Sequence, residues 1–236
     1  MKVEIFSDIA CPWCYIGKTR FEDALSRYEH AGSVELVWRS FQLDPTAPTE
    51  NPGTTVAHLA HKYGVSEGRA LAMMDNATKA AAEDGLEFHL DRALSSNTFD
   101  AHRLAHLAVA KGKGREVMER LMHAYQSDGA NVADHETLVA LSVEAGMEES
   151  DVRETLASGA YADAVETDFA RARAYGVNGV PFFVFDETHG VSGAQPAEFF
   201  LAALRQLGPQ PAPLQTLDGA DETVQCGPDG CEVPAG

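Results

Sequence analysis

The pattern of hydrophobic and polar positions predicts a strand, a helix and a second strand at the start of the chain. Residues 3–7 carry the β-branched and aromatic side chains that are typical of a strand. A helical spacing then places Phe21, Leu25 and Tyr28 on one face. Residues 34–38 are a second apolar run and predict another strand. Because a crossover helix joins parallel strands, we expect these two strands to pair in parallel.

A loop rich in Pro and Thr at residues 42–52 leads into a long segment with the hydrophobic spacing of helices. Ser66, and Asn97 followed by Asp100, are typical of helix N-termini, and glycines stand where several of these helices are expected to end. The predicted helices span residues 55–63, 66–83, 97–111, 115–126, 135–145, 149–157 and 161–175.

Strand character returns near the end of the chain. Residues 182–185 predict a buried strand and residues 190–193 its hairpin partner, before a helix that opens at Pro196 and runs to Leu207. Without the helical segment the order is β-α-β-α-β-β-α, a thioredoxin-type arrangement, so we predict an α/β fold with an inserted all-helical domain. The predicted limits are 1–45 and 176–207 for the thioredoxin-like domain, 46–175 for the helical insertion and 208–236 for a flexible C-terminal tail.

Composition and charge exclude several classes of function. Hydrophobic residues make up 44% and charged residues 23% of the 236 positions, a balance that is typical of a folded globular protein. The formal net charge of −18 argues against nucleic-acid binding and against docking on anionic membranes, because both need clustered cations. The sequence has no apolar run of membrane-spanning length and no secretory pattern at its start, so we expect a cytoplasmic protein.

Four cysteines form two close pairs, Cys11 with Cys14 and Cys226 with Cys231. Structural disulfides are rare in a reducing compartment, so two local pairs indicate either redox chemistry or a metal. A zinc site built from all four cysteines is therefore one alternative, although the Pro and Trp within the first pair argue against it.

Cys11-Pro12-Trp13-Cys14 stands where the first strand passes into the first helix. Cys11 would lie near the helix N-cap with Pro12 at the first helical position. Free backbone N–H groups and the helix dipole favour an anion there, so we predict Cys11 as the attacking thiolate. Cys14 lies within disulfide reach on the same helix face and would resolve the mixed disulfide. Trp13 is expected to form an apolar rim that binds substrate.

Val180-Pro181 precedes the buried strand at residues 182–185. Pro181 can be a trans proline that ends the loop, or it can follow a cis peptide bond in a tight turn. The match to the first half favours the cis form, because a redox β-α-β unit needs a loop that faces its cysteines. The backbone of Val180 would then pair with an extended substrate chain.

Cys226 and Cys231 are separated by Gly-Pro-Asp-Gly, a strong turn sequence that brings their sulfurs together. The coil at residues 209–225 spans roughly 23 Å, compared with a radius of gyration of about 17 Å for the preceding domain. We therefore predict an accessory redox pair that reaches the first pair, and the alternative is a passive tail.

Three further residues have weaker claims to a function. Asp8 could assist proton transfer to a leaving thiol, or it could be a turn residue at a strand end. His102 and His106 have the spacing of metal ligands but lack the Glu of an H-E-x-x-H motif. We therefore expect both histidines on a solvated helix face and predict no metal site from them.

The motif at residues 6–18, the segment at 176–185, residues 191–195 and the helical insertion together resemble the DsbA family of thioredoxin-like oxidoreductases. More narrowly, the chain is similar to the FrnE subgroup, whose members are cytoplasmic and in some cases carry a C-terminal cysteine pair. The resemblance covers about residues 1–207. It implies Cys11 as the nucleophile, Cys14 as the resolving thiol and Pro181 as the cis-proline.

The predicted function is thiol–disulfide exchange of the reductase or isomerase type. The resemblance and the motifs indicate protein or peptide thiols and disulfides as partners, together with small thiols such as glutathione. No organic cofactor or metal is needed, because the cysteine pair carries the two electrons. Besides the zinc-binding protein, the other alternative is a glutathione-dependent isomerase or transferase of the same architecture, which typically carries Ser at the position of Cys11.

Overall fold

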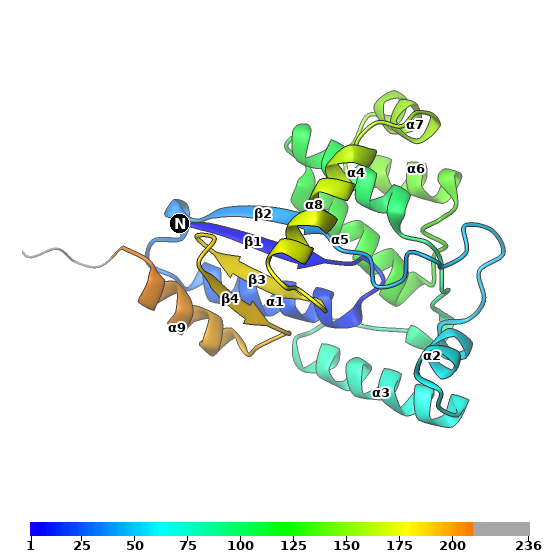
Figure 1. Cartoon of the computed structure of the whole chain (residues 1–236), viewed down its shortest axis with the longest axis horizontal. Helices are drawn as coiled ribbons and strands as arrows, with labels where there is room; N and C mark the ends of the chain where they lie inside the picture. Colours follow the sequence, from blue (N-terminus) through cyan, green and yellow to red (C-terminus); the bar gives the residue numbers. More distant parts are fainter. Residues whose placement is uncertain (210–236) are drawn as a thin grey trace, which may run out of the picture.

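In the computed structural model, which describes residues 1–209, a four-stranded mixed sheet has the order β2-β1-β3-β4 (Figure 1). β1 pairs in parallel with β2, as predicted, and β3 lies antiparallel to both β1 and β4. The strands are β1 Lys2–Ser7, β2 Glu35–Ser40, β3 Phe182–Phe185 and β4 His189–Ser192. All four predicted strands are confirmed, with limits shifted by one or two residues outside β3.

One face of the sheet is covered by helices α1, Pro12–Ser26, and α9, Ala197–Leu207. Phe21 of α1 stacks on Phe183 of β3 with ring centroids 5.4 Å apart, and Phe200 of α9 lies 4.5 Å from the same ring. These three rings are fully buried, so aromatic packing fixes both helices against the sheet. The start of α1 is thereby set at the C-terminal end of β1.

The opposite face of the sheet is held to α8, Ala162–Ala174, by buried ion pairs. Glu4 of β1 is fully buried and accepts hydrogen bonds from Arg39 at 2.7 Å and Arg171 at 2.8 Å. Burial raises the pKa of Glu4, but the hydrogen bonds and the positive charges of these two arginines together outweigh burial and lower the pKa overall. Asp168 of α8 accepts a hydrogen bond from the Ser40 backbone at 2.8 Å.

The segment between β2 and β3 is helical, as predicted, and α8 is its last helix (Figure 1). The other helices in it are α2 Thr55–Tyr63, α3 Glu67–Glu83, α4 Phe99–Ala110, α5 Gly114–His123, α6 His135–Glu144 and α7 Glu149–Ala157. Short helical turns in this segment are η2 Leu90–Arg92 and the π-helical η3 Ala124–Asp128, and a further one, η1 Ala31–Ser33, lies between α1 and β2. The π-helical turn η3 continues α5, so the helix expected at residues 115–126 changes its hydrogen bonding in its final turn.

One of the two predicted helix caps is confirmed and the other is wrong. The hydroxyl of Ser66 accepts a hydrogen bond from the Arg69 backbone and caps α3. Helix α4 instead has Thr98 as its N-cap, one residue later than expected, although the Asn97 side chain accepts a hydrogen bond from the Phe99 backbone at 2.9 Å. The Asn97 amide also donates to backbone carbonyls in the loop before α2, so this side chain holds that loop against the start of α4.

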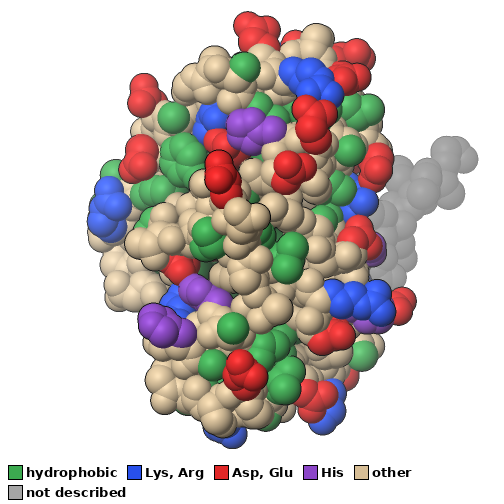
Figure 2. Space-filling model, turned by 90° about the vertical axis from the view of Figure 1, so that its right-hand side faces the viewer, with side chains coloured by type: hydrophobic (Ala, Val, Ile, Leu, Met, Phe, Trp, Pro, Cys, Tyr) green, Lys and Arg blue, Asp and Glu red, His purple; other side chains and the backbone are tan. Residues whose placement is uncertain are grey.

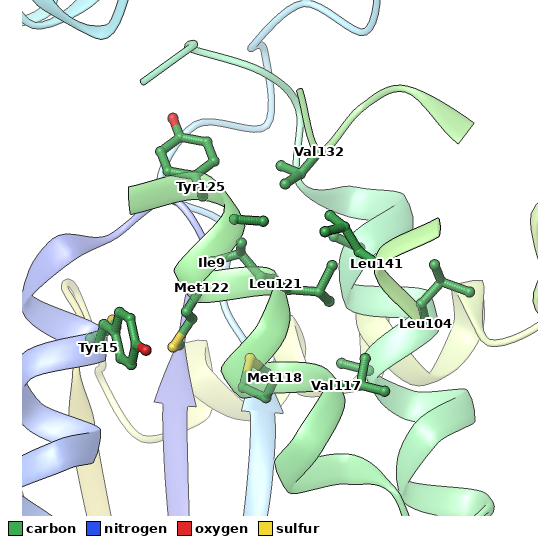
Figure 3. Close-up of a cluster of buried hydrophobic side chains, with 14 of the residues drawn as sticks. Ile9, Tyr15, Leu104, Val117, Met118, Leu121, Met122, Tyr125, Val132 and Leu141 are labelled. Atoms are coloured by element: carbon green, nitrogen blue, oxygen red, sulfur yellow. The ribbon is translucent and has the colours of Figure 1, made fainter. Parts of the chain in front are cut away.

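A single hydrophobic core joins the start of α1 to the helical segment. Figure 3 shows Ile9 and Tyr15 beside Met118, Met122 and Tyr125 of α5 and η3. Cys11 and Cys14 belong to the same cluster of buried residues. The cysteines therefore lie where the sheet and its covering helices meet the helical segment, whereas the exact residue limits of the two domains stay a prediction.

Charged side chains are scattered over the surface in Figure 2, where Lys and Arg lie singly among Asp and Glu. Helices in the described part of the chain are all too short or too polar to cross a membrane. Residues 210–236, with Cys226 and Cys231, lie outside the described residues, so the predicted tail and its cysteine pair stay predictions.

Candidate active site

Cys11 occupies the N-cap of α1, and Pro12 takes the first helical position, as predicted. The turn after β1 is closed by a hydrogen bond from the Cys11 backbone N–H to the Asp8 carbonyl at 3.1 Å. The Cys14 N–H in turn donates to the Cys11 carbonyl at 3.0 Å and starts the helix. Proline suits this position because its missing N–H would have no partner inside the helix.

Both thiols are free and buried, with Cys11 4% and Cys14 1% exposed. Burial raises the pKa of the Cys14 thiol, and the neighbouring Cys11 sulfur raises it further. Hydrogen bonding from the Asp8 backbone opposes these effects only in part. Cys14 is therefore held as a protonated thiol while Cys11 is reduced.

The Val180–Pro181 peptide bond is cis, which confirms that expectation, and it lies against the start of α1. Cys11 Sγ donates a hydrogen bond to the Val180 carbonyl oxygen at 3.5 Å. Pro181 packs so closely on Gly17 of α1 that a Cβ at Gly17 would lie 2.9 Å from Pro181 Cγ. The structure thus brings Cys11, Cys14, Val180 and Pro181 together, although the roles predicted for them stay predictions.

A cavity of about 270 Å³ opens beside Cys11, between the start of α1, the loop after β2 and helices α2 and α3. Cys11, Pro12, Trp13 and Val180 line one part of it. Trp13 is 40% exposed, so its ring lies at the surface of the molecule beside the sulfur. Further apolar lining residues are Leu43, Leu59, Met73, Met74, Ala77, Leu90 and Ala93.

Asp8, which lines the cavity, and His102 form a buried pair, and this corrects the expectation of a solvated histidine. Each residue is 1% exposed, and His102 Nε2 lies 3.4 Å from Asp8 Oδ1. The Asp8 carboxylate also accepts from the Leu43 backbone at 2.7 Å and from Ala10 at 3.3 Å, so it holds the loop after β2 against the turn after β1. Asp8 is therefore the turn residue at the end of β1, one of the two alternatives, and it is a buried one.

His106, one helical turn further along α4, is not on a solvated face either. Its Nε2 lies 3.0 Å from Asp168 Oδ2 and 3.2 Å from Ser40 Oγ. The serine and the carboxylate meet the same ring nitrogen, so this group lacks the two-sided contact that a Ser-His-Asp catalytic triad requires. Helix α4 is buried on most sides, and its high content of Ala and Leu was the feature of the sequence that could have indicated this burial.

Four polar residues that line the cavity had no motif to reveal them in the sequence. They come from two separate segments and are Ser96, Thr98, Tyr125 and Gln126. All four are buried. Ser96 and Thr98 lie in the loop before α4, and the other two lie in η3, so only the tertiary fold brings them together.

Within residues 1–209 there is no group of three or more His, Cys, Asp or Glu side chains placed to hold a metal ion. The zinc alternative requires Cys226 and Cys231, which lie outside the described residues, so it stays an untested prediction.

Comparisons with known proteins agree with this geometry. A probable DsbA oxidoreductase from Streptomyces coelicolor is 45% identical, with both chains fully covered and a TM-score of 0.85. The cytosolic disulfide reductase DsbM from Pseudomonas aeruginosa, solved with GSH, is 19% identical with a TM-score of 0.61 over 87% of this chain and 98% of its own, a likeness of fold alone. The uncharacterized protein YwbO of Bacillus subtilis is 25% identical over 206 residues, which are 86% of this chain and 94% of YwbO. Residues 2–205 match the profile of the DSBA-like thioredoxin domain, and the chain therefore belongs to the DSBA-like thioredoxin domain family.

Proposed function

We propose that this protein is a thiol–disulfide oxidoreductase in which Cys11 and Cys14 exchange two electrons with a substrate disulfide. The observation that carries the proposal is the pair of free thiols at a helix N-terminus, beside a cis-proline loop and an open cavity. Membership of the DSBA-like family supports it. Zinc binding and a glutathione-dependent isomerase activity remain the alternatives.

The exchange has two steps. The Cys11 thiolate attacks one sulfur of the substrate disulfide, forms a mixed disulfide and releases the other sulfur as a thiolate that takes up a proton. Cys11 then carries no negative charge, so one of the causes that raise the pKa of Cys14 is removed. Cys14 loses its proton and attacks the Cys11 sulfur, which closes the Cys11–Cys14 disulfide and releases the substrate as a second thiol. The substrate gains two electrons and the enzyme loses two.

The substrates we propose are protein or peptide disulfides and small thiols such as glutathione. A peptide could pair with the Val180 backbone and rest an apolar side chain on Trp13, which is exposed beside the cavity. The relative DsbM is a disulfide reductase solved with GSH, which supports testing glutathione. We further propose a cytoplasmic, reductive or isomerising role without an organic cofactor.

We also propose that Cys226 and Cys231 form a second redox pair that reduces the Cys11–Cys14 disulfide. The tail dithiol would lose two electrons to the active-site disulfide and would then be reduced by a small thiol. A Cys14→Ser protein should form a disulfide between Cys11 and a tail cysteine, with a yield independent of protein concentration. A passive tail would give no such cross-link, and removal of residues 210–236 would leave the turnover unchanged.

The experiment that tests the proposed function follows reduction of glutathione disulfide by the reduced protein, in a background with Cys226→Ser and Cys231→Ser. We expect the parent to become fully oxidised at Cys11 and Cys14, and Cys14→Ser to accumulate a mixed disulfide with glutathione on Cys11. Cys11→Ser should lose the exchange. Exchange at the parent rate in Cys11→Ser would contradict the proposal.

A further inference from the structure

Ser7, the last residue of β1, has a buried hydroxyl that lacks a hydrogen-bond partner within residues 1–209. The residue is 1% exposed, so water does not reach the hydroxyl either. Leaving a buried hydroxyl unpaired costs free energy, because the group gives up its hydrogen bonds to water and gains none in return. Since buried polar groups are normally paired, a serine kept at this position indicates a use in another state of the protein.

The alternation of side chains along β1 places the Ser7 side chain on the face of the sheet that α1 covers. Ile5 points to that face and packs in one cluster with Phe21 of α1, whereas Phe6 packs in a separate cluster with α8. Ser7 follows Ile5 by two residues and therefore shares its face. Cys14 lies in the first turn of α1, directly after the end of β1, and is also 1% exposed.

The Ser7 hydroxyl acts on the Cys14 sulfur. Burial is the largest cause that raises the pKa of the Cys14 thiol and the Cys11 sulfur raises it further, whereas the Ser7 side chain and the Asp8 backbone lower it. A hydroxyl lowers the pKa of a thiol by donating a hydrogen bond to the charged thiolate. A neutral thiol is only a weak acceptor, which explains why the hydroxyl is unpaired while Cys14 keeps its proton.

We propose that Ser7 donates a hydrogen bond to the Cys14 thiolate as that thiolate forms in the second step of the exchange. Cys14 loses its proton and attacks the Cys11 sulfur, the released substrate thiolate takes up a proton, and Ser7 keeps its own proton throughout. A hydrogen bond to a charged acceptor is about twice as strong as a neutral one, so it favours formation of the thiolate. This inference rests on the proposed function and adds a residue to its resolving step.

The test follows the two steps separately in a Cys226→Ser/Cys231→Ser protein mixed with a limiting amount of 5,5′-dithiobis(2-nitrobenzoate). This disulfide releases one coloured thiolate when Cys11 attacks it and a second when Cys14 resolves the mixed disulfide. Only the first phase depends on protein concentration, which assigns the two phases. We expect Ser7→Ala to slow the second phase by about fivefold or more at pH 7 and to change the first phase less than twofold.

Two further readouts separate this role from a structural one. The pH profile of the second phase should shift to higher pH in Ser7→Ala, because a group that lowers the pKa of Cys14 is removed. The reduced Ser7→Ala protein should unfold in urea at the parent midpoint or above it, because the substitution removes an unpaired buried hydroxyl.

Ser40→Ala is the matched control. Ser40 lies opposite Ser7 in the register of β1 and β2 and is 4% exposed, and its hydroxyl lies 3.2 Å from His106 Nε2. Because this hydroxyl is paired, its removal should lower the urea midpoint and should leave the rate of each phase within twofold of the parent rate.

A second phase at the parent rate in Ser7→Ala, equal slowing of both phases, or a loss of stability in that variant would overturn the inference. Failure of the proposed function is detected separately, as a parent protein that releases no second thiolate. The hydrogen bond is then tested without exchange, by alkylation of Cys14 with iodoacetamide in a Cys11→Ser protein. Ser7→Ala should shift the pH profile of this alkylation to higher pH, and an unchanged profile would contradict the inference.

Discussion

Lys18 is a buried ammonium whose carboxylate partners tie α1 to α5. Its side chain is 3% exposed, and its Nζ lies 3.0 Å from Glu22 and also contacts Glu119 of α5. The Tyr15 hydroxyl donates to the same Glu119 carboxylate. Removing every carboxylate from a buried ammonium costs about 3–5 kcal/mol. We therefore expect Glu22→Gln/Glu119→Gln to lower the free energy of unfolding by about that amount.

Single changes at this cluster should cost less than the double change. Glu119→Gln should cost about 1–2 kcal/mol, because Lys18 keeps Glu22 and Glu119 itself is 44% exposed. Lys18→Met should cost less than the double variant, because an apolar side chain of similar size replaces the buried charge. Asp75→Asn, which breaks an exposed pair with Lys79, is the control and should cost about 0–1 kcal/mol.

Urea unfolding followed by circular dichroism at pH 7 measures these free energies. A double variant as stable as Lys18→Met would refute the reasoning.

The pH dependence of the free energy of unfolding gives a second check. Burial raises the pKa of Glu119, but hydrogen bonds from Lys18 and Tyr15 and the positive charges of Lys18 and Arg115 together outweigh burial, and the pKa is lowered overall. The stabilisation is thus present above the unfolded pKa of about 4.3 and is lost as pH falls through the lower folded value. The difference between wild type and Glu119→Gln should shrink towards pH 3, and a constant difference would contradict the assignment.

Two further predictions concern the active site. Iodoacetamide at pH 7 should label Cys11 at least tenfold faster than Cys14, because Cys11 lines the cavity whereas the pKa of the buried Cys14 thiol is raised. Peptide mass spectrometry measures the labelling rate of each cysteine, and equal rates would count against Cys11 as the nucleophile and Cys14 as the resolving thiol. Gly17→Ala should destabilise the protein by about 1 kcal/mol and slow thiol–disulfide exchange, because the new methyl group meets Pro181. Gly32→Ala is the control and should be neutral, because its methyl group meets nothing within 4 Å. Equal effects of the two substitutions on stability and exchange would show that the contact between Gly17 and Pro181 is unimportant.

Local patterns were sufficient to predict most of the fold. The run Phe182–Phe185 carries strong strand propensity between a proline and a turn, and β3 has those limits. The start of α4 was misplaced by two residues, because Thr98 is the N-cap and the Asn97 side chain, which accepts from the Phe99 backbone, also bonds to a distant loop. Contacts of that kind depend on the tertiary fold and leave no local signal.

The candidate site also contains residues that local sequence patterns could predict and residues that only the tertiary fold brings together. Cys11 and Cys14 stand within one short motif at a strand–helix junction, so both their positions and their helix-end setting could be predicted. His102 was expected in solvent because its partner, Asp8, lies far away in sequence and the two meet only after folding. The buried polar residues Ser96, Thr98, Tyr125 and Gln126 of the cavity lining were missed for the same reason, since the loop before α4 and η3 meet only in the folded protein.

The central claim, that Cys11 and Cys14 form one reversible two-electron couple, can be tested by redox titration. A protein with Cys226→Ser and Cys231→Ser is equilibrated in glutathione buffers of varied ratio, alkylated, and analysed by intact mass and peptide mapping. The account predicts one transition between the dithiol and a Cys11–Cys14 disulfide, with a tenfold change in the equilibrium for about every 30 mV. Absence of that disulfide at every ratio, or a glutathione-capped Cys11 as the stable oxidised form throughout, would contradict it.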